Sequence, residues 1–473
     1  MARFQGASAF APVTDLQLLP LRFERLSDNR YVVNNLAGDA LLLTRHELDR
    51  VVALDVAPGD GLYERAFEKM LISAHGQQSQ LQLLAMRLRS RMAFLQGPTP
   101  LHLFVVTLRC EHSCPYCQVS RRSVDRDRFD MSTATAMRAV DVALSAPSPS
   151  IKIEFQGGEP LLNFPLIKEI VKVARRKAPP GKRVDFVIAT NLALLDDEII
   201  AFCRDEGVSL STSLDGPADL HNKNRPRPGG NSHQLAVNGI RRIQEELGRD
   251  RVSALMTTTQ ASLGRVEEII DEYLRLELDG IFLRPLSPYG FAIKTKQFDK
   301  YGGQEWLRFY EQGLRYILDT NKRGRHFPEF YATLLLKRML SDLPIGYVDL
   351  RSPAGIGLGA LVYNYDGKVF ASDEGRMLAE MGDRTFELGD LATDDYGALV
   401  LSEKLVELVG GSLSQCSPEC SSCAFEPYCG SDPVYHYATQ GDPVGIKPLS
   451  EFCENGGGKV SHGSGGIVPL PAE

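Results

Sequence analysis

Three cysteines within eight residues constrain this chain more than any other feature. Cys110, Cys114 and Cys117 have the spacing CxxxCxxC and come directly after the apolar run 101–107. One loop can direct three thiolates at one face of a cuboidal iron–sulfur cluster, and because such clusters normally take four thiolates, one iron would stay open for another ligand. The alternative is a structural zinc site, which needs a fourth protein ligand. His112 is too close in sequence to Cys110 and Cys114 to serve easily.

The composition is that of an ordinary globular chain without a basic surplus. Its 473 residues are 43% apolar and 24% charged, which is typical of a soluble protein with more than one domain. A formal net charge of −7 gives no basic footprint for nucleic acid. No apolar run approaches the ~18 residues that span a bilayer. We therefore expect neither a nucleic acid nor a membrane as partner.

The distribution of the cysteines indicates the compartment. Eight of the nine cysteines fall into two groups, and Cys203 stands alone. The first residues lack the continuous apolar segment of a signal peptide. Clustered cysteines in a chain without an export signal favour metal binding over disulfides. We expect a cytoplasmic protein.

Between residues 101 and 290, apolar strand-like runs alternate with amphipathic helical stretches. The predicted strands are 101–107, 151–156, 184–189, 208–213, 252–257 and 281–283, and the predicted helices are 132–145, 164–176, 196–206, 232–247 and 265–274. This alternation implies an α/β fold with a parallel sheet and right-handed crossovers. Six such units are too few for an eight-unit barrel. We expect an open barrel whose active site lies at the C-terminal ends of the strands.

A second motif stands at the end of the second predicted strand. It reads Gln-Gly-Gly-Glu-Pro over residues 156–160. Adjacent Gly157 and Gly158 let a backbone pass close to a ligand without a side-chain clash. The Glu159 carboxylate can accept a charge-assisted hydrogen bond from an ammonium group. A plain turn followed by a helix that starts at Pro160 is the alternative.

The cysteine loop and the Gly-Gly-Glu-Pro motif together resemble the signatures of radical S-adenosylmethionine (SAM) enzymes. The resemblance implies a partial (β/α)6 barrel and a 4Fe–4S cluster on Cys110, Cys114 and Cys117. It also implies SAM as cofactor, with its amino and carboxylate groups on the open iron. In that family the second motif holds the amino group of SAM, a role that falls here on residues 157–159.

Polar residues after the third and fourth strands receive roles from the same resemblance. Asn191 matches a stretch whose side chains face the SAM ribose, although Leu192 replaces the usual glycine. Ser213 and Asp215 match a stretch that lines the ribose and substrate side, and a plain Asp-Gly-Pro turn is the alternative for Asp215. Asp215 and the three loop cysteines are the expected catalytic residues. The polar run 221–225 resembles the mobile substrate-side loop of peptide-modifying relatives.

Two further site residues follow from chemistry. The ring of Tyr116, beside Cys117, can pack against the adenine of SAM, and simple loop packing is the alternative. Arg284, at the end of the sixth strand, can pair with a carboxylate of SAM or of a peptide. A surface salt bridge is the alternative for Arg284.

A second cysteine group lies toward the C-terminus. It comprises Cys416, Cys420, Cys423, Cys429 and Cys453. Four or five cysteines can hold a second 4Fe–4S cluster with every iron bound by the protein, whereas a zinc ribbon would pair two CxxC units and one occurs here. Cys420, Cys423, Cys429 and Cys453 resemble the ligands of the second auxiliary cluster of the SPASM branch of radical SAM enzymes, which mature ribosomally made peptides. Cys416 is an additional ligand candidate.

The first auxiliary cluster of the SPASM branch does not carry over. Ser372 and Pro433 stand where that branch has cysteines, and the cysteine expected near Ser352 is absent. One auxiliary 4Fe–4S cluster is therefore predicted.

The whole-chain pattern is most similar to the radical SAM maturases of the His-Xaa-Ser repeat peptide system. The similarity rests on Arg22-Phe23, on residues 32–39 and on the stretch 429–433. It implies a precursor peptide with His-Xaa-Ser repeats and a second radical SAM maturase as partners. An electron donor such as flavodoxin or ferredoxin is also implied.

Residues 1–95 are predicted to form a small α+β domain. Two short strands lie in 31–43, Thr44 and Glu47 form a capping box, and a helix covers 61–72. Such units resemble the peptide-recognition domains that accompany peptide-modifying enzymes, and a structural cap on the main domain is the alternative. The other predicted domains are the barrel (96–300), a helical bridge (301–345), a SPASM-like cluster domain (346–455) and a disordered tail (456–473).

These features predict an enzyme that cleaves SAM to a 5′-deoxyadenosyl radical and abstracts hydrogen from a ribosomally made peptide. An oxidative cross-link or a similar modification would follow. Two alternatives stay open: a radical SAM enzyme that modifies an active-site residue of a protein, and a non-enzymatic iron–sulfur or zinc protein. The Gly-Gly-Glu-Pro motif counts against the latter, because an electron carrier needs no SAM site.

Overall fold

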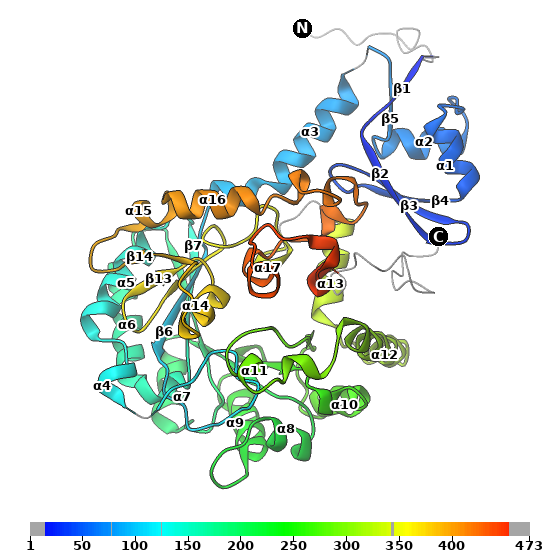
Figure 1. Ribbon diagram of the computed structural model, residues 1–473. Helices are drawn as coiled ribbons and strands as arrows, with labels where there is room; N and C mark the ends of the chain where they lie inside the picture. The colour runs from blue at the N-terminus through cyan, green and yellow to red at the C-terminus, as the bar shows by residue number, and fades with distance from the viewer. Residues whose placement is uncertain (1–14, 77, 124, 342–344, 454–473) are drawn as a thin grey trace.

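A nine-stranded sheet forms the centre of the protein (Figure 1). The computed structural model describes residues 15–76, 78–123, 125–341 and 345–453. The strand order is β11-β10-β9-β8-β7-β6-β12-β13-β14. These strands are β6 (Leu101–Thr107), β7 (Ser150–Gly157), β8 (Arg183–Ala189), β9 (Ser209–Ser213), β10 (Val252–Thr257), β11 (Leu283–Arg284), β12 (Ala360–Tyr363), β13 (Lys368–Phe370) and β14 (Glu387–Asp390).

Strands β6 to β11 are parallel and lie side by side in chain order. Figure 1 shows α5, α6, α7 and α9 following one another along the outside of this sheet. The helices of this part are α4 (Arg126–Phe129), α5 (Thr133–Ser145), α6 (Phe164–Lys177), α7 (Asp197–Asp205), α8 (Ala218–Asn224), α9 (Ser232–Glu246) and α10 (Val266–Arg275). The predicted α/β fold with an open row of six strand–helix units is confirmed. The expected mobile loop at 221–225 is wrong, because most of it belongs to α8.

Polar side chains cap the starts of α5 and α7, and the apolar faces of the helices pack on the sheet. Ser132 Oγ accepts a hydrogen bond from Thr135 N at 3.1 Å, and Asp196 Oδ1 accepts one from Ile199 N at 2.9 Å. Both satisfy backbone donors that a helix start leaves without partners. The buried side chains of strands and helices form one large apolar core. Polar chemistry is therefore left to the loops at the strand ends.

The C-terminal region extends the sheet beyond the predicted barrel. Strand β12 pairs in parallel with β6, and a hairpin over residues 364–367 joins β12 to the antiparallel β13. At the β6–β12 contact, His102 Nδ1 and Tyr363 Oη lie 2.8 Å apart, and both side chains are buried. Burial lowers the pKa of His102 to about 3, so its ring is neutral. Residues from 360 onward thus cover the edge of β6.

A small α+β unit lies apart from the large sheet, at the upper right of Figure 1. Its elements are β1 (Leu16–Leu18), β2 (Leu21–Ser27), β3 (Arg30–Asn35), β4 (Ala40–Leu43), α1 (Arg45–Val52), α2 (Gly61–Glu68) and β5 (Ile72–Ala74). The predicted capping box is present: Glu47 N donates to Thr44 Oγ1 at 3.2 Å, and Thr44 N to Glu47 Oε2 at 2.7 Å. The helix expected to reach residue 72 ends earlier. Met70 takes a φ of +51°, and the chain turns into β5, which pairs with β1.

The N-terminal unit docks onto the C-terminal cysteine region. Arg22 Nη1 lies 2.6 Å from Glu426 Oε2, and the two side chains are 8% and 2% exposed. Arg22 Nε also donates to Ser421 O at 2.8 Å. Tyr428 Oη donates to Gly38 O at 2.6 Å. Buried polar contacts therefore join the two ends of the chain.

The remaining elements connect these parts. Helix α3 (Ser79–Arg91) leads from the N-terminal unit toward the sheet. The range of the predicted helical bridge, 301–345, contains α12 (Gly303–Lys322) and α13 (Phe330–Leu340). The others are α11 (Phe291–Lys294), α14 (Asp373–Glu380), α15 (Tyr396–Val400), α16 (Glu403–Gly411), α17 (Pro433–Gln440) and α18 (Glu451–Cys453). Among the described residues, no helix is long and apolar enough to cross a membrane. The tail expected at 456–473 lies outside the described residues, and the domain boundaries stay predictions.

Arg22→Ala is expected to lower the free energy of unfolding by about 3–5 kcal/mol, because it leaves the Glu426 carboxylate buried without its partner. Urea denaturation measures this loss. Arg25→Ala is the matched control on the same strand, since its ion pair with Asp28 is exposed and contributes little. Equal effects of the two substitutions would contradict a structural role for the buried pair.

Candidate functional site

A buried ion pair fixes the start of the cysteine loop. Arg109 donates from Nε and from Nη2 to the two carboxylate oxygens of Asp130, each at 2.7 Å. Thr107 Oγ1 donates to Asp130 Oδ1 at 2.6 Å, and Arg109 Nη2 also donates to Leu162 O at 2.8 Å. A two-pronged contact of this kind sets direction as well as distance. The chain is therefore held rigidly just before Cys110.

Gly157 and Gly158 mark the point where the loops after β6 and β7 touch. A Cβ at Gly157 would lie 1.9 Å from Thr107 O, and one at Gly158 would lie 2.2 Å from Arg109 O. Gly158 N donates to Thr107 O at 2.9 Å, and Glu159 N donates to Arg109 O at 2.7 Å. No side chain fits between these backbones. The glycines thus bring the second motif against the cysteine loop, a contact within the protein that the sequence did not indicate.

Glu159 is buried where β7 and β8 end. It is 1% exposed. Thr190 Oγ1 donates to its Oε1 at 2.7 Å, and Asn191 N donates to its Oε2 at 2.8 Å. Burial, and then the charge of Glu111, raise the pKa of Glu159 to about 8. Within the described ranges no lysine or arginine pairs with this carboxylate, so the site can accept a cation from outside.

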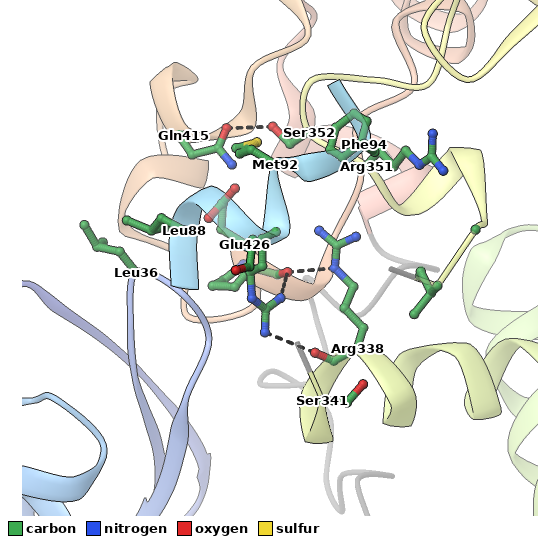
Figure 2. Close-up of a pocket in the computed structure, with 15 residues that line it drawn as sticks. Leu36, Leu88, Met92, Phe94, Arg338, Ser341, Arg351, Ser352, Gln415 and Glu426 are labelled. Carbon is green, nitrogen blue, oxygen red and sulfur yellow. Dashed lines mark hydrogen bonds between the residues drawn. The ribbon is translucent and has the colours of Figure 1, made fainter. Parts of the chain in front are cut away.

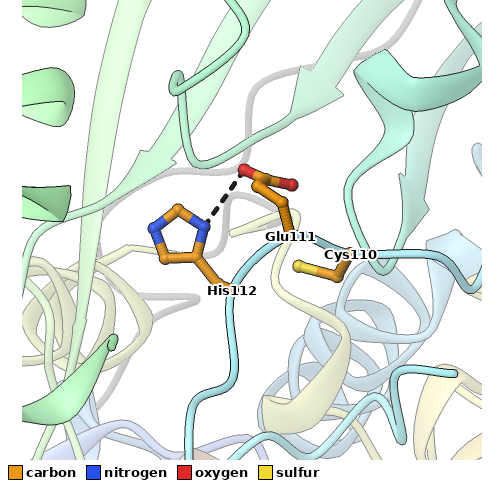
Figure 3. Close-up of side chains that lie close together, drawn as sticks. All are labelled: Cys110, Glu111 and His112. Atoms are coloured by element: carbon orange, nitrogen blue, oxygen red, sulfur yellow. Dashed lines mark hydrogen bonds and ion pairs between the residues drawn. The ribbon is translucent and has the colours of Figure 1, made fainter. Parts of the chain in front are cut away.

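Cys110, Glu111 and His112 lie close together (Figure 3). Their donor atoms are within 4.8 Å of one another, so, contrary to expectation, closeness in sequence does not prevent His112 and Cys110 from facing the same point. Asn191 Nδ2 lies 2.7 Å from Glu111 Oε1 and 2.9 Å from His112 Nδ1. Glu111 Oε2 is buried without a hydrogen-bond partner. The predicted ribose residue Asn191 therefore also holds the cysteine loop.

The three loop thiols fit a cluster that has one open iron. All three are half-buried. Burial raises the pKa of Cys110. Burial also raises the pKa of Cys114, to about 12. The charge of Arg225 opposes this rise at Cys114, whereas the neighbouring Cys117 adds to it. Crowded thiols in such a place ionise when a metal centre takes up their negative charge. Three thiolates from one loop leave one iron of a four-iron cluster for another ligand.

Asp215, Arg225 and Tyr116 form a buried group beside the loop. Arg225 donates to the two oxygens of Asp215 at 2.9 and 3.2 Å, and Tyr116 Oη donates to Asp215 Oδ2 at 2.5 Å. Burial disfavours the charge of Asp215, but Arg225 and then His221 outweigh it and lower the pKa. The Arg225 guanidinium lies 5.4 Å from the centre of the Tyr116 ring. The adenine contact predicted for Tyr116 stays a prediction, since Arg225 lies over that ring.

A cavity of about 450 Å³ lies between the sheet and the C-terminal region and reaches from Leu101, the first residue of β6, to Gln156 and Arg284 near the ends of β7 and β11. Gln118, Gln156 and the predicted site residue Arg284 line it on the sheet side. Ser213, at the end of β9, is half-buried and does not line this cavity. The opposite wall comes from the C-terminal region and includes Tyr289, Asp349, Ser372, Asp373, Glu374, Ser431, Asp432 and Pro433. This cavity joins the predicted SAM motifs to the predicted cluster domain.

Three of the C-terminal cysteines lie near enough to Cys429 for their charges to raise its pKa. Burial and then the charges of Cys453, Cys423 and Cys420 raise the pKa of Cys429 to about 12. Cys416 is exposed and is not among the thiols that act on Cys429. Four thiols in one place fit a cluster with every iron bound by the protein. Cys416 stays a prediction as an additional ligand.

A small cavity of about 70 Å³ lies next to this cysteine region (Figure 2). Arg338 Nε and Arg91 Nη1 both donate to Pro427 O, at 2.7 and 3.2 Å. Burial and then the charge of Arg91 lower the pKa of Arg338 to about 10. Both guanidinium groups thus hold the turn that precedes Cys429. The cavity lies where α3, α13 and the C-terminal region meet, and none of the residues predicted for SAM lines it.

Sequence reasoning missed several residues of this region. They are Glu111, Arg225, Tyr289, Glu374 and Asp432. The sequence carried a signal for two of them, since Glu374 lies two residues after Ser372 and Asp432 directly before Pro433, the positions where cysteines were expected. Arg225 lies ten residues after its partner Asp215, and no spacing rule links the two.

Comparison with known proteins identifies the central region. Residues 104–281 match the family model of the Radical SAM superfamily. An uncharacterised protein of Methanocaldococcus jannaschii is 33% identical over 28% of this chain and 45% of its own length. The serine-type anaerobic sulfatase-maturating enzyme of Klebsiella aerogenes is 24% identical over 49% of this chain and 58% of its own length. The chain thus spans about half the length of these relatives.

Solved structures share the fold over longer stretches. Native anSMEcpe with bound AdoMet superimposes with a TM-score of 0.63 at 17% identity, over 75% of this chain and 95% of that one. Streptococcus suis SuiB bound to the precursor peptide SuiA superimposes with a TM-score of 0.53 at 14% identity, over 91% of this chain and 98% of that one. At these identities the likeness shows the fold. The predicted α/β fold class is confirmed, and its central part is the region that matches the radical SAM family model.

Gly158→Ala is expected to lower the free energy of unfolding by at least about 2 kcal/mol and to reduce iron incorporation, because its Cβ would collide with the Arg109 carbonyl. Urea denaturation and iron analysis of the anaerobic protein measure both effects. Gly264→Ala is the control, since nothing lies within 4 Å of a Cβ there. Normal stability and iron content in Gly158→Ala would contradict the close approach.

The acids of the large cavity predict a pH dependence. Burial, and then the charges of Asp349 and Asp432, raise the pKa of Glu374 from 4.5 to about 8. The folded protein then binds this proton more tightly than the unfolded chain, so stability falls as the pH rises from about 4.5 to about 8. Glu374→Gln should remove ~1 kcal/mol or more of this fall, measured as urea midpoints at both ends of the window. Glu407→Gln, on the exposed face of α16, should keep the dependence of the unmodified protein; an unchanged dependence in Glu374→Gln would contradict the assignment.

Proposed function

We propose that this chain, whose residues 104–281 form a radical SAM domain, is a maturase that uses SAM to abstract a hydrogen atom from a residue of a peptide. One observation carries the proposal: the backbone contact that sets the three-thiol loop against Gly157, Gly158 and the buried Glu159. A site that binds an amino acid group on an open iron needs both features in one place. An electron carrier or a zinc protein needs the thiols alone.

Cys110, Cys114 and Cys117 would hold the 4Fe–4S cluster at the end of β6. When bound and reduced, this cluster supplies the electron that splits SAM into methionine and a 5′-deoxyadenosyl radical. The Arg109–Asp130 pair and the β7 glycines keep the loop in one position. A fixed loop favours one orientation of SAM and therefore one direction of attack.

The polar residues at the ends of β7, β8 and β9 would bind SAM. Glu159 can accept hydrogen bonds from the ammonium group, which would relieve the cost of its buried charge. Asn191 and Ser213 would contact the ribose. Asp215, kept ionised by Arg225, would face the ribose and substrate side. These groups orient the reactive carbon against one C–H bond and exclude competing donors.

Cys420, Cys423, Cys429 and Cys453 would hold one auxiliary 4Fe–4S cluster. Four protein thiolates leave no open iron, so this second centre suits electron transfer or structure and not SAM cleavage. A flavodoxin or ferredoxin would be the electron donor.

The substrate that we favour is a ribosomally made precursor peptide with His-Xaa-Ser repeats, modified by an oxidative cross-link or similar change together with a second radical SAM maturase. The superposition with SuiB in complex with SuiA supports a peptide, because it leaves 9% of this chain outside. That share is smaller than the first 95 residues, so the likeness of fold extends into the N-terminal unit. An active-site residue of a protein is the second candidate, favoured by the sulfatase-maturating relatives.

Alanine at Cys110, Cys114 and Cys117 together is expected to remove about four of about eight irons per chain and to abolish SAM cleavage. Iron and sulfide analysis, electron paramagnetic resonance with and without SAM, and 5′-deoxyadenosine release by the dithionite-reduced protein measure these effects. Cys203→Ala is the control, because this cysteine lies alone in the core and should leave both unchanged. SAM cleavage by the triple variant, or stoichiometric zinc in the unmodified protein, would refute the proposal.

A further inference from the structure

Several aspartate and glutamate side chains line the cavity of about 450 Å³ between the sheet and the C-terminal region. We propose that this cavity binds a positively charged side chain of the substrate, lysine or arginine, and so holds the peptide beside the residue that is modified. This inference rests on the proposed function, because it names the substrate class of that same site.

The cavity lies against the SAM motifs. Gln118 directly follows Cys117, Gln156 directly precedes Gly157, and both line the cavity. Its volume of about 450 Å³ is in the range of sites that enclose small organic groups. A side chain bound here would therefore lie next to two of the segments that are proposed to hold the cluster and SAM.

Five carboxylates line the cavity, and four of them form no ion pair with a lysine or arginine in the part of the chain that the structure describes. These four are Glu154, Asp349, Glu374 and Asp432. Asp373 differs, since Arg376 Nε donates to its Oδ1 at 2.8 Å. Arg284 is the one basic residue among those that line the cavity. Asp349 is exposed, whereas Glu374 and Asp432 are half-buried. An unpaired charge that is partly withdrawn from water is costly, and a cation from the substrate would reduce that cost.

Two buried hydroxyl groups on this wall also have no partner. Tyr289 and Ser431 are 1% and 3% exposed and line the cavity, yet neither side-chain oxygen makes a hydrogen bond within the described residues. Burial, and then the nearby charges of Asp432 and Glu374, raise the pKa of Tyr289. A hydroxyl accepts hydrogen bonds from ammonium or guanidinium groups, while the surrounding carboxylates would repel an anion. The two hydroxyl groups without partners would therefore suit a ligand that carries a positive charge and N–H donors.

The spacing of the acids argues for an organic cation and against a metal ion. Within the described ranges, Cys110, Glu111 and His112 make the one group whose three donor atoms approach within 4.8 Å of one another. The carboxylates of the cavity do not converge in this way, whereas Mg²⁺ and Ca²⁺ need oxygen ligands around a single point. A long side chain with several N–H donors can satisfy separated acceptors.

The same wall contains the positions that lack cysteines. Ser372 and Pro433 line the cavity, and no cysteine does. The space that the resemblance assigns to a first auxiliary cluster is therefore lined by acids and hydroxyls. Burial, and then the charges of neighbouring acids, raise the pKa of both Glu374 and Asp432. Such shifts are expected where carboxylates lie close to one another.

The test is a binding measurement on the holoprotein with both clusters and SAM. The probes are fluorescein-labelled Gly-Ser peptides that differ in one central residue: lysine against norleucine, and arginine against citrulline. Fluorescence anisotropy should show that a charged peptide binds about tenfold or more tightly than its neutral counterpart. The lysine and arginine arms show which cation the cavity prefers.

Variants assign that selectivity to the cavity. Glu374→Gln combined with Asp432→Asn should reduce the ratio to about one, and asparagine still accepts the helix-capping hydrogen bonds that Asp432 Oδ1 receives from Val434 N and Tyr435 N. Tyr289→Phe should lower the ratio about threefold. Glu407→Gln, on exposed α16, should leave it unchanged. Iron content and far-ultraviolet circular dichroism check that each variant is folded and loaded.

Three results would overturn the inference: equal binding of charged and neutral peptides, no binding of any, or selectivity that persists in the double variant. Divalent metal bound by the unmodified holoprotein and lost in the double variant would assign the cavity to a metal instead. None of these results would contradict the proposed function if the unmodified protein cleaves SAM. Loss of SAM cleavage in the unmodified, fully loaded protein would refute the function whatever the peptides do.

Discussion

Contact between two backbones at the ends of β6 and β7 holds this site together. The Thr107 and Arg109 carbonyl groups accept hydrogen bonds from Gly158 N and Glu159 N, and the missing side chains of the two glycines make the approach possible. Glu159 then reaches Thr190 and Asn191, and Asn191 returns to the cysteine loop through Glu111. The ends of three neighbouring strands form one connected polar network. A cluster loop, an ammonium-binding carboxylate and a ribose-facing amide would keep fixed relative positions because they share it.

The periodicity of apolar residues was enough to predict the individual strands and helices of the central region. The strands and helices between residues 101 and 290 occur close to where their apolar patterns predicted them, and Thr44 caps its helix as expected. Contacts between distant segments were not predictable in this way. The pairing of β12 with β6 and the partnership of Arg225 with Asp215 depend on tertiary structure, which no spacing in the chain encodes. His112 illustrates the same limit, since closeness in sequence argued against it as a ligand beside Cys110, yet the turn of the loop places their donor atoms within 4.8 Å of each other.

The N-terminal unit and the C-terminal cysteine region are physically linked. The stretches 22–23 and 32–39, which carried a sequence similarity, supply Arg22 and Gly38 to contacts with Glu426 and Tyr428. A structural cap explains these contacts directly. Peptide recognition remains compatible with them, because the outer strands β2 and β4 of the small sheet each pair on one side only with β3. The unit can hold the cysteine region through one surface and keep a strand edge for another purpose.

The parallel pairing of β6 with β12 has a consequence for synthesis. Strand β6 is complete at residue 107, but the strand that covers its second edge ends at residue 363. On the ribosome, a buried, apolar strand edge would thus stay open while more than half of the chain is still being made. Exposed edges of this kind invite pairing with other chains. We expect the nascent protein to need shielding by chaperones until its C-terminal third emerges, which makes production of truncated forms of this protein prone to aggregation.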